Sequence, residues 1–117
     1  MTEAPGFLLF VYGSLKRGQS NHHELGSALF VGEVRTVPQF ALRMLDGYPL
    51  LIAGAQSIRG ELFLLPTARL PTLDAFEGEQ YERREIELAD RRCVLTYVAR
   101  DPSTGIAYPG DEWPDSK

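Results

Sequence analysis

The sequence is poor in residues that cross-link a chain or bind metal. It has one cysteine, Cys93, and two histidines, the adjacent His22 and His23. A lone cysteine cannot form a disulfide within the chain, and no Cys/His spacing matches a structural zinc site. We therefore expect neither a metal nor an organic cofactor. Cys93 lies in a short apolar segment and is predicted to be a small buried core residue rather than a nucleophile.

Long hydrophobic runs and an excess of positive charge are also missing. The longest apolar runs, residues 6–12 and 93–99, are far too short to span a bilayer. The N-terminus has an acid and no basic cluster, so we expect no signal peptide, no membrane partner and a cytoplasmic location. Twelve Lys and Arg against sixteen Asp and Glu give a net charge of −4, which argues against nucleic acid as a partner. A small molecule is the expected partner, and the oligomeric state is left open.

The composition that is present is that of one folded domain. Of the 117 residues, 44% are hydrophobic and 24% are charged, as in ordinary globular proteins. A chain of this length buries roughly two thirds of its unfolded surface. We predict a single domain over residues 1–117. Within it, residues 101–117 are rich in proline and glycine and are predicted to form an irregular, partly mobile C-terminal tail.

Short apolar segments, separated by turn residues, predict a chain rich in strands. Seven strands are predicted, at residues 7–12, 28–37, 39–45, 48–53, 58–65, 81–88 and 92–100. The dipeptide Asp46-Gly47 predicts a hairpin between the third and the fourth. One short helix is predicted after Asn21, and another over the apolar residues that recur every three positions before Gly78. Six or seven short strands with two short helices packed outside predict an α+β fold, a small mixed β-barrel.

Residues 11–18, Val-Tyr-Gly-Ser-Leu-Lys-Arg-Gly, lead from a buried strand directly into a glycine-containing loop. The backbone N–H groups of such a loop have no ladder partners and can bind an anion or an oxyanion. The spacing matches neither a phosphate-binding P-loop nor the nucleophile elbow of a hydrolase. An ordinary strand-to-loop turn is the alternative interpretation.

Glu77 falls where the second predicted helix ends, one residue before Gly78. The negative end of a helix dipole raises the pKa of a carboxyl group placed there. A carboxyl that titrates near neutral pH can accept a proton as a general base and return it as an acid. The alternative is an exposed glutamate in an acidic stretch, since other glutamates follow closely.

Tyrosines fall at the ends of four predicted strands, as Tyr12, Tyr48, Tyr81 and Tyr97. They either line a pocket, with the ring packed and the hydroxyl donating, or form the edge of the core. A triad of Ser14, His22 and Asp74 is conceivable, but nothing in the spacing supports it.

Several motifs, taken in order, resemble the gamma-glutamylcyclotransferase-like family, and within it the members that act on gamma-glutamyl amines. They are VYGSLKRGQ at 11–19, NH at 21–22, YPL at 48–50, IAG at 52–54, GELF at 60–63, LDAFE at 73–77 and YER at 81–83. The resemblance runs from residue 9 to about residue 98. It is carried by a Tyr-Gly-Ser-Leu run on the first strand, followed later by Asp-x-Phe-Glu on a helix.

This resemblance implies a small mixed β-barrel and an enzyme that needs no cofactor. In such an enzyme the α-amine of the substrate attacks its own δ-carbonyl, which releases 5-oxoproline and a free amine. The resemblance implies that Glu77 is the general acid/base and that four residues cradle the gamma-glutamyl group: Tyr12, Gly13, Ser14 and Leu15. Tyr48 and Tyr81, in further matching motifs, are expected in the same binding site. A non-catalytic domain that binds or senses a small molecule in this pocket is the alternative.

Overall fold

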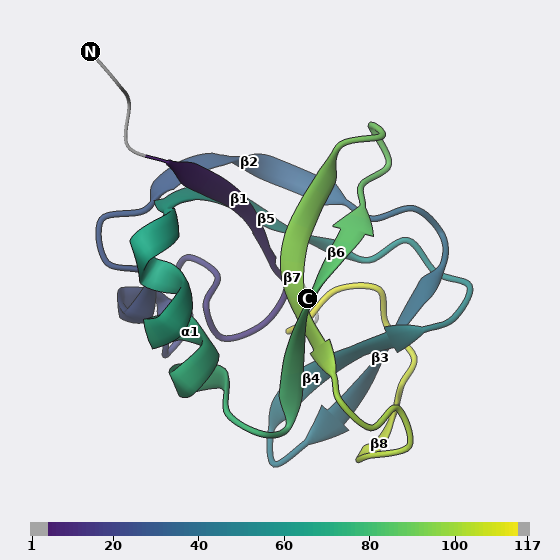
Figure 1. The fold of residues 1–117 in the computed structure, drawn as a ribbon. Helices are drawn as coiled ribbons and strands as arrows, with labels where there is room; N and C mark the ends of the chain where they lie inside the picture. Colours follow the sequence, from purple (N-terminus) through teal and green to yellow (C-terminus); the bar gives the residue numbers. More distant parts are fainter. Residues whose placement is uncertain (1–4, 115–117) are drawn as a thin grey trace.

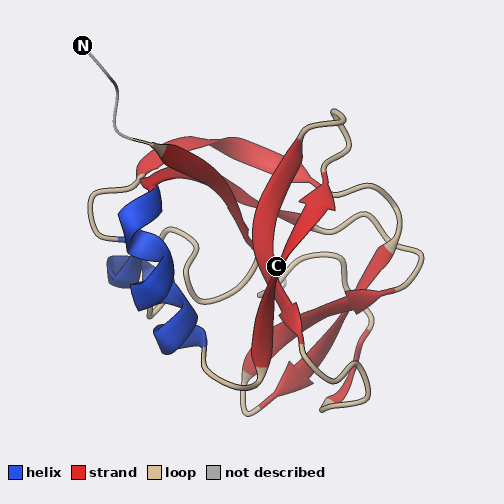
Figure 2. Cartoon of the chain, viewed as in Figure 1, coloured by secondary structure: helices blue, strands red, loops and turns tan. Residues whose placement is uncertain are grey.

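Strands dominate the fold, and the helices are few and short. In a computed structural model, the structure describes residues 5–114. The elements are β1 (Gly6–Val11), η1 (His22–Leu25), β2 (Leu29–Arg35), β3 (Phe40–Leu45), β4 (Tyr48–Ala53), β5 (Arg59–Pro66), η2 (Thr67–Arg69), α1 (Leu70–Glu77), β6 (Tyr81–Glu87), β7 (Cys93–Ala99) and β8 (Ile106–Tyr108) (Figure 1). The seven predicted strands are confirmed to within one or two residues at each end. The helices lie together on one side of the strands (Figure 2), and the α+β class is as predicted.

A five-stranded sheet forms the centre of the molecule, in the order β2-β5-β1-β7-β6. Its middle strand, β1, pairs antiparallel with β5 and parallel with β7, through Leu9 and Leu95. The sheet is therefore mixed. The remaining strands form a separate three-stranded sheet, in the order β4-β3-β8, at the lower end of the view in Figure 1.

The two edges of the five-stranded sheet approach each other at one end. Beyond the ends of β2 and β6, Thr36 and Leu88 form an isolated bridge, and Val37 N donates to the Glu87 carbonyl at 3.1 Å. No continuous ladder joins these edges within residues 5–114. The closed barrel that we predicted is therefore not confirmed. Pro38 follows this bridge, and because proline has no N–H it cannot extend the ladder.

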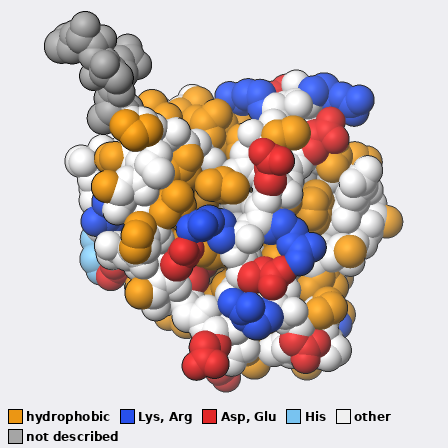
Figure 3. Space-filling model, viewed as in Figure 1, with side chains coloured by type: hydrophobic (Ala, Val, Ile, Leu, Met, Phe, Trp, Pro, Cys, Tyr) orange, Lys and Arg blue, Asp and Glu red, His pale blue; other side chains and the backbone are white. Residues whose placement is uncertain are grey.

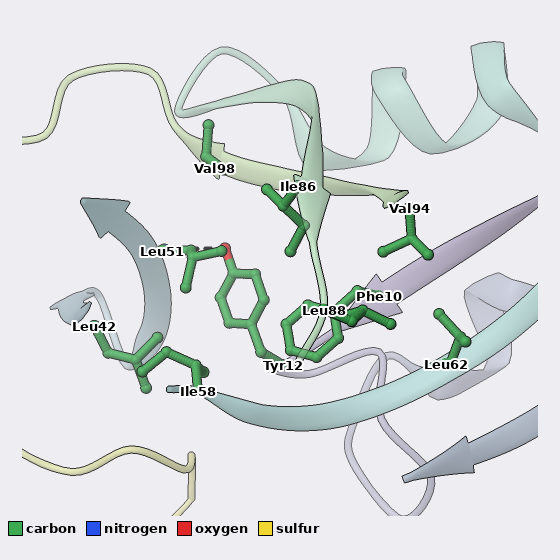
Figure 4. Packing of buried hydrophobic residues seen from close by; sticks show 10 residues of the cluster. All are labelled: Phe10, Tyr12, Leu42, Leu51, Ile58, Leu62, Ile86, Leu88, Val94 and Val98. Carbon is green, nitrogen blue, oxygen red and sulfur yellow. Dashed lines mark hydrogen bonds between the residues drawn. The ribbon is translucent and has the colours of Figure 1, made fainter. Parts of the chain in front are cut away.

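Both faces of β1 are buried, as its continuous apolar run predicts. Leu9 and Val11 face the helices and pack with Leu73 of α1. Phe10 and Tyr12 face the other way, into a second core cluster that includes residues of both sheets (Figure 4). Because successive side chains of β1 point to opposite faces, this one strand contributes to both core clusters. Tyr12, directly after the strand, extends the second cluster to the start of the loop.

The Asp46-Gly47 turn joins β3 and β4, as predicted. Leu45 pairs with Tyr48 at the end of the ladder, and the φ angles of Asp46 and Gly47 are 52° and 85°. Two consecutive residues with positive φ are what a type I′ hairpin turn requires, and Asp-Gly adopts that conformation readily.

Part of the C-terminal tail is regular, contrary to the prediction. Residues 106–108 form β8, which pairs with β3, and the Arg43 side chain donates to the carbonyls of Thr104 and Gly105 at 2.7 and 2.6 Å. A strand of three residues is too short for its periodicity to be recognised in the sequence. Its position also depends on Arg43, which is far away in the chain. Residues 115–117 of the tail lie outside the described residues, as do residues 1–4, on which the prediction of no signal peptide partly rests.

The prediction for Cys93 was wrong, because its side chain is exposed. It is the first residue of β7, and the strand becomes buried on both faces only beyond it. On the face shown in Figure 3, hydrophobic side chains gather over the helical side, and acidic and basic side chains intermix elsewhere. Among residues 5–114, no helix is long and apolar enough to cross a membrane.

Candidate active site

A cavity of about 390 Å³ opens where β1 ends, a volume typical of small-molecule sites. Its walls come from the loop after β1, the β3–β4 hairpin, the end of α1 with the start of β6, and β7. It is lined by Phe10, Val11, Tyr12, Gly13, Ser14, Leu15, Asn21, Leu45, Asp46, Tyr48, Pro49, Leu50, Phe76, Glu77, Gln80, Tyr81, Thr96 and Tyr97. Every site residue predicted from the sequence is among them, so the fold brings these distant segments to one place.

The loop after β1 lines this cavity with Gly13, Ser14 and Leu15. Lys16 N and Asn21 N donate to the carbonyls of Gly13 and Ser14, each at 3.0 Å. Asn21 Nδ2 also donates to Ser14 Oγ at 2.9 Å. The N–H groups of Gly13, Ser14 and Leu15 have no acceptor within residues 5–114. They are therefore available to an anionic or oxyanionic group of a ligand.

Glu77 is the last residue of α1, and its carboxyl group lines the cavity half-buried. It has no hydrogen bond or ion pair with any of the residues that the structure describes. Burial raises its pKa from the ordinary value of 4.5 to about 7. The direction of this shift is the predicted one, but the cause in the structure is loss of solvent rather than the helix dipole. Gly78 ends the helix with a φ of 75°, and its N–H donates to the Asp74 carbonyl at 3.1 Å, so the helix stops directly after Glu77.

One turn earlier on α1, Asp74 ties the helix to two strands. Its Oδ1 accepts a hydrogen bond from the Tyr97 hydroxyl at 2.6 Å. Its Oδ2 lies 2.6 Å from Nη1 of Arg83 on β6. Burial and the Asp74 carboxylate both raise the pKa of Tyr97. These contacts hold the C-terminal half of the helix, and with it Glu77, against β6 and β7.

Two of the tyrosines hold strand β4 against the rest of the site. The Tyr12 hydroxyl donates to the Tyr97 carbonyl at 2.6 Å and accepts from Leu51 N at 3.1 Å, the second contact being the dashed line in Figure 4. The Tyr81 hydroxyl donates to the Pro49 carbonyl at 2.8 Å. Burial raises the pKa of both tyrosines. Their hydroxyl protons are already used within the protein, so these side chains offer the cavity their rings rather than the donors that we expected.

Gly13, in the loop after β1, also lies against strand β4. A Cβ on Gly13 would lie 2.8 Å from Pro49 Cγ, closer than two carbon atoms pack. The absence of a side chain therefore lets the loop lie directly on β4. The loop and the β3–β4 hairpin therefore lie side by side at the cavity.

We expect replacement of Tyr12 by phenylalanine to lower the free energy of unfolding by about 1–3 kcal/mol, because a buried donor and a buried acceptor each lose a partner. Tyr48→Phe is the matched control. Tyr48 is 42% exposed, and its hydroxyl has no partner within the described part of the chain, so its loss should change stability by less than about 0.5 kcal/mol. Urea unfolding of both variants measures the difference, and equal midpoints would contradict the role given to Tyr12.

The conceivable serine triad is not formed. Ser14 Oγ accepts from Asn21 and contacts neither of the other two residues. His22 Nδ1 lies 2.8 Å from the Leu15 carbonyl oxygen, and Asp74 is engaged by Tyr97 and Arg83. Among the residues that the structure describes, Ser14 therefore has no neighbouring base that could activate it.

Lys16 and Arg17 do not line the cavity. Lys16 is buried on the far side of the loop, and that burial lowers its pKa. Arg17 pairs with Glu61 and Glu33 and lies over the Phe30 ring, 3.6 Å from the ring centroid. Neither side chain is therefore placed to contact a ligand in the cavity.

Sequence reasoning missed several residues that line the cavity. The sequence predicts Asp46 as a turn residue and Asn21 as a helix cap and part of a matching motif, but neither as a site residue, and nothing in the local pattern singles out Gln80 or Thr96. Within residues 5–114, no group of three or more His, Cys, Asp or Glu side chains could hold a metal ion.

Comparisons with known proteins agree on one family. The family model described as gamma-glutamyl cyclotransferase, AIG2-like, matches residues 9–115. A human protein named gamma-glutamylaminecyclotransferase is 44% identical, over 92% of this chain and 69% of its own length. The gamma-glutamylcyclotransferase family protein YtfP of Escherichia coli K12 is 33% identical, over 84% and 87%.

A solved structure supports the same assignment. An AIG2-like protein of Mus musculus superposes with a TM-score of 0.80 and 26% identity, covering 96% of this chain and 90% of that one. The family match extends over nearly the whole chain, and relatives well above 30% identity cover most of it. The chain therefore belongs to the gamma-glutamyl cyclotransferase, AIG2-like family of enzymes.

Proposed function

We propose that this protein converts a gamma-glutamyl amine or a gamma-glutamyl amino acid to 5-oxoproline and a free amine, with Glu77 as the general acid/base. One observation carries the proposal. A carboxyl group whose pKa is about 7 lines the same cavity as three backbone N–H groups, and neither the carboxyl nor these N–H groups have a partner within residues 5–114. The family to which the chain belongs supports the same reaction class.

The reaction requires two proton transfers between two nitrogens. The α-ammonium group must lose a proton before its nitrogen can attack the δ-carbonyl carbon. As the new C–N bond closes the five-membered ring, the attacking nitrogen loses a second proton and the bond to the leaving nitrogen breaks. Both protons end on the leaving amine, and no water is consumed. One carboxyl group within reach of both nitrogens can carry each proton in turn, provided that its pKa is near neutral.

The rest of the cavity positions the substrate. Because the attack is intramolecular, the protein mainly has to hold the gamma-glutamyl chain in its folded, reactive geometry. The free N–H groups of residues 13–15 suit the α-carboxylate or the oxyanion that forms on the δ-carbonyl oxygen. The rings of Tyr12 and Tyr81 form apolar walls, and the exposed Tyr48 hydroxyl is available to the substrate.

The test is release of 5-oxoproline by the purified protein from a panel of gamma-glutamyl amines and gamma-glutamyl dipeptides. We expect release from at least one member, in equal amount to the free amine. Release from none of them would overturn the proposed reaction and favour a domain that binds a small molecule in this cavity without turning it over.

A further inference from the structure

One motif of the sequence lies next to the candidate site without lining it. The GELF motif occupies residues 60–63, on strand β5, and none of these residues lines the cavity. β5 runs beside β1 (Figure 1), and Glu61 is the cross-strand partner of Val11, the last residue of β1. Glu61 therefore stands beside the point where the chain leaves the sheet and enters residues 13–19, which we call the site loop.

The site loop consists of two consecutive turns. Lys16 N donates to the Gly13 carbonyl, and Gln19 N donates to the Lys16 carbonyl, each at 3.0 Å. Each of these bonds closes a four-residue turn, so the two turns share Lys16. The N–H of Arg17, directly after the shared residue, has no backbone acceptor within residues 5–114. A hydrogen bond to this N–H fixes the joint between the two turns.

The carboxylate of Glu61 makes that hydrogen bond. Glu61 Oε1 accepts from Arg17 N at 2.8 Å, and its Oε2 lies 3.4 Å from Arg17 Nε. The Glu61 side chain is only 12% exposed, so water competes little for the bond. An ionised acceptor also makes it stronger than a bond between neutral groups. The joint of the site loop is therefore attached to β5, and the charge of the attaching carboxylate is balanced by the arginine.

This joint fixes one end of the segment whose N–H groups have no acceptor. Residues 13–15, which carry those groups, lie between the end of β1 and the joint. Asn21 and His22 also bond to this segment, but both belong to the stretch of chain that continues from the loop. Among residues 5–114, Glu61 is the one side chain of the central sheet that hydrogen-bonds to the backbone of the site loop. It therefore relates the direction of the N–H groups to the rest of the site.

We propose that Glu61 is a positioning residue for the reaction. By holding the Arg17 N–H, it keeps the N–H groups of residues 13–15 in the geometry that binds an anionic or oxyanionic group of the substrate. This step rests on the proposed function. Donors that are in place before the reaction stabilise developing charge without having to reorganise. Glu61 acts only through the backbone of the site loop and has no part in the proton transfers.

Two variants of equal side-chain length test this role. Glu61→Met fills the same space without an oxygen acceptor, whereas Glu61→Gln keeps an amide oxygen that can accept from Arg17 N. With the best substrate of the panel, we expect kcat/KM of Glu61→Met to fall by about tenfold to a hundredfold, because misplacement of a site by about 1 Å has an effect on this scale. We expect kcat/KM of Glu61→Gln to stay within about threefold of the wild type. The pH at which kcat/KM rises should be the same in both variants, because Glu77 does not contact Glu61.

The matched controls remove the neighbouring charges and keep the backbone hydrogen bond. Arg17→Ala removes the ion pairs with Glu61 and Glu33 but leaves its own backbone N–H in place. Glu33→Gln removes a carboxylate that pairs with Arg17 and Arg59 but does not bond to the backbone of the loop. Each should leave kcat/KM within about threefold of the wild type. A loss in either control as large as that of Glu61→Met would assign the effect to the charges and overturn the role of the hydrogen bond.

A second measurement does not depend on turnover. Backbone ¹⁵N relaxation gives an order parameter for each amide of residues 13–15. We expect about 0.85, the value of rigid backbone, in the wild type and in Glu61→Gln, and less than about 0.6 in Glu61→Met. A side chain with a merely structural role would change the urea midpoint and leave both the order parameters and kcat/KM unchanged.

The outcomes separate this inference from the proposed function. Turnover by the wild type, with a rigid loop or an unchanged kcat/KM in Glu61→Met, overturns the positioning role and leaves the reaction standing. A Glu61→Gln variant as impaired as Glu61→Met also overturns it. No release of 5-oxoproline by the wild type overturns the reaction and the part of Glu61 in it, while the relaxation measurement still decides whether Glu61 holds the loop.

Discussion

Replacing Glu77 with glutamine is expected to lower kcat for 5-oxoproline release by a factor of about 10² to 10⁴, the usual contribution of a general acid/base. The amide keeps the size of the side chain but can neither accept the proton of the α-ammonium group nor return it. Steady-state assays of the purified variant, with the best substrate of the panel, measure the loss. The matched control is Glu79→Gln, two residues along the chain, at an exposed position outside the cavity. Near-normal turnover by the Glu77 variant would overturn the mechanism.

The pH dependence of kcat/KM of the wild type is a second test of the role of Glu77. As the base, Glu77 must be ionised in the free enzyme, so kcat/KM should rise with pH through about 7, the pKa that burial gives this carboxyl. A group that stayed fully exposed would instead place this rise near 4.5. A pH–rate profile that is flat between pH 5 and 8 would argue against Glu77 as the base.

The same substitution should stabilise the fold at neutral pH. The pKa of Glu77 is 4.5 when it is free and about 7 in the folded protein, so the folded state binds more protons between these values. The free energy of unfolding of the wild type therefore falls as the pH rises from 4.5 to 7. The Glu77→Gln variant does not lose stability in this way. We expect its free energy of unfolding to exceed that of the wild type by on the order of 2 kcal/mol above pH 7 and to equal it near pH 4. A folded, more stable and inactive variant would show that the lost activity is chemical rather than structural.

Replacing Gly60 with alanine is expected to cause the largest loss of stability among single-methyl additions to the central sheet. A Cβ at this position of β5 would overlap the Val11 carbonyl oxygen and lie 2.7 Å from the Phe10 ring. Phe10 is fully buried and cannot move aside. The clash falls at the end of β1, immediately before the loop of the site, so the strand and the loop must shift together. We expect a loss of about 3 kcal/mol, the upper end for an overpacked core, and weaker substrate binding.

Gly32→Ala is the matched control for that clash. Gly32 lies on β2, which pairs with β5, and a Cβ there would have nothing within 4 Å. An added methyl group at an open position of a strand should be neutral or slightly stabilising. Urea unfolding of the two variants compares the same chemical change with and without the clash. Equal stabilities would show that β1 and β5 can separate freely at Gly60.

Local pattern predicted most of the elements because their causes are local. Strand periodicity, the Asp46-Gly47 turn and the glycine after Glu77 depend on residues close in sequence. The same logic put Glu77 at a helix end and the loop after Tyr12 at a strand end. The part of the prediction that concerned packing was less successful, since Cys93 is exposed and a short strand lies in the tail.

The sequence by itself determined the strands, the turns and the residue types able to carry acid/base chemistry, because these follow from the conformational preferences of neighbouring residues. Only the tertiary structure decided what surrounds each of them. It half-buried Glu77 with no partner among residues 5–114, and because a pKa depends on solvent and charge in three dimensions, burial rather than the helix dipole is the cause of its shift. It likewise placed the hydroxyls of Tyr12 and Tyr81 in hydrogen bonds with backbone carbonyls. Each of these outcomes depends on contacts between segments far apart in the chain, which no local pattern encodes.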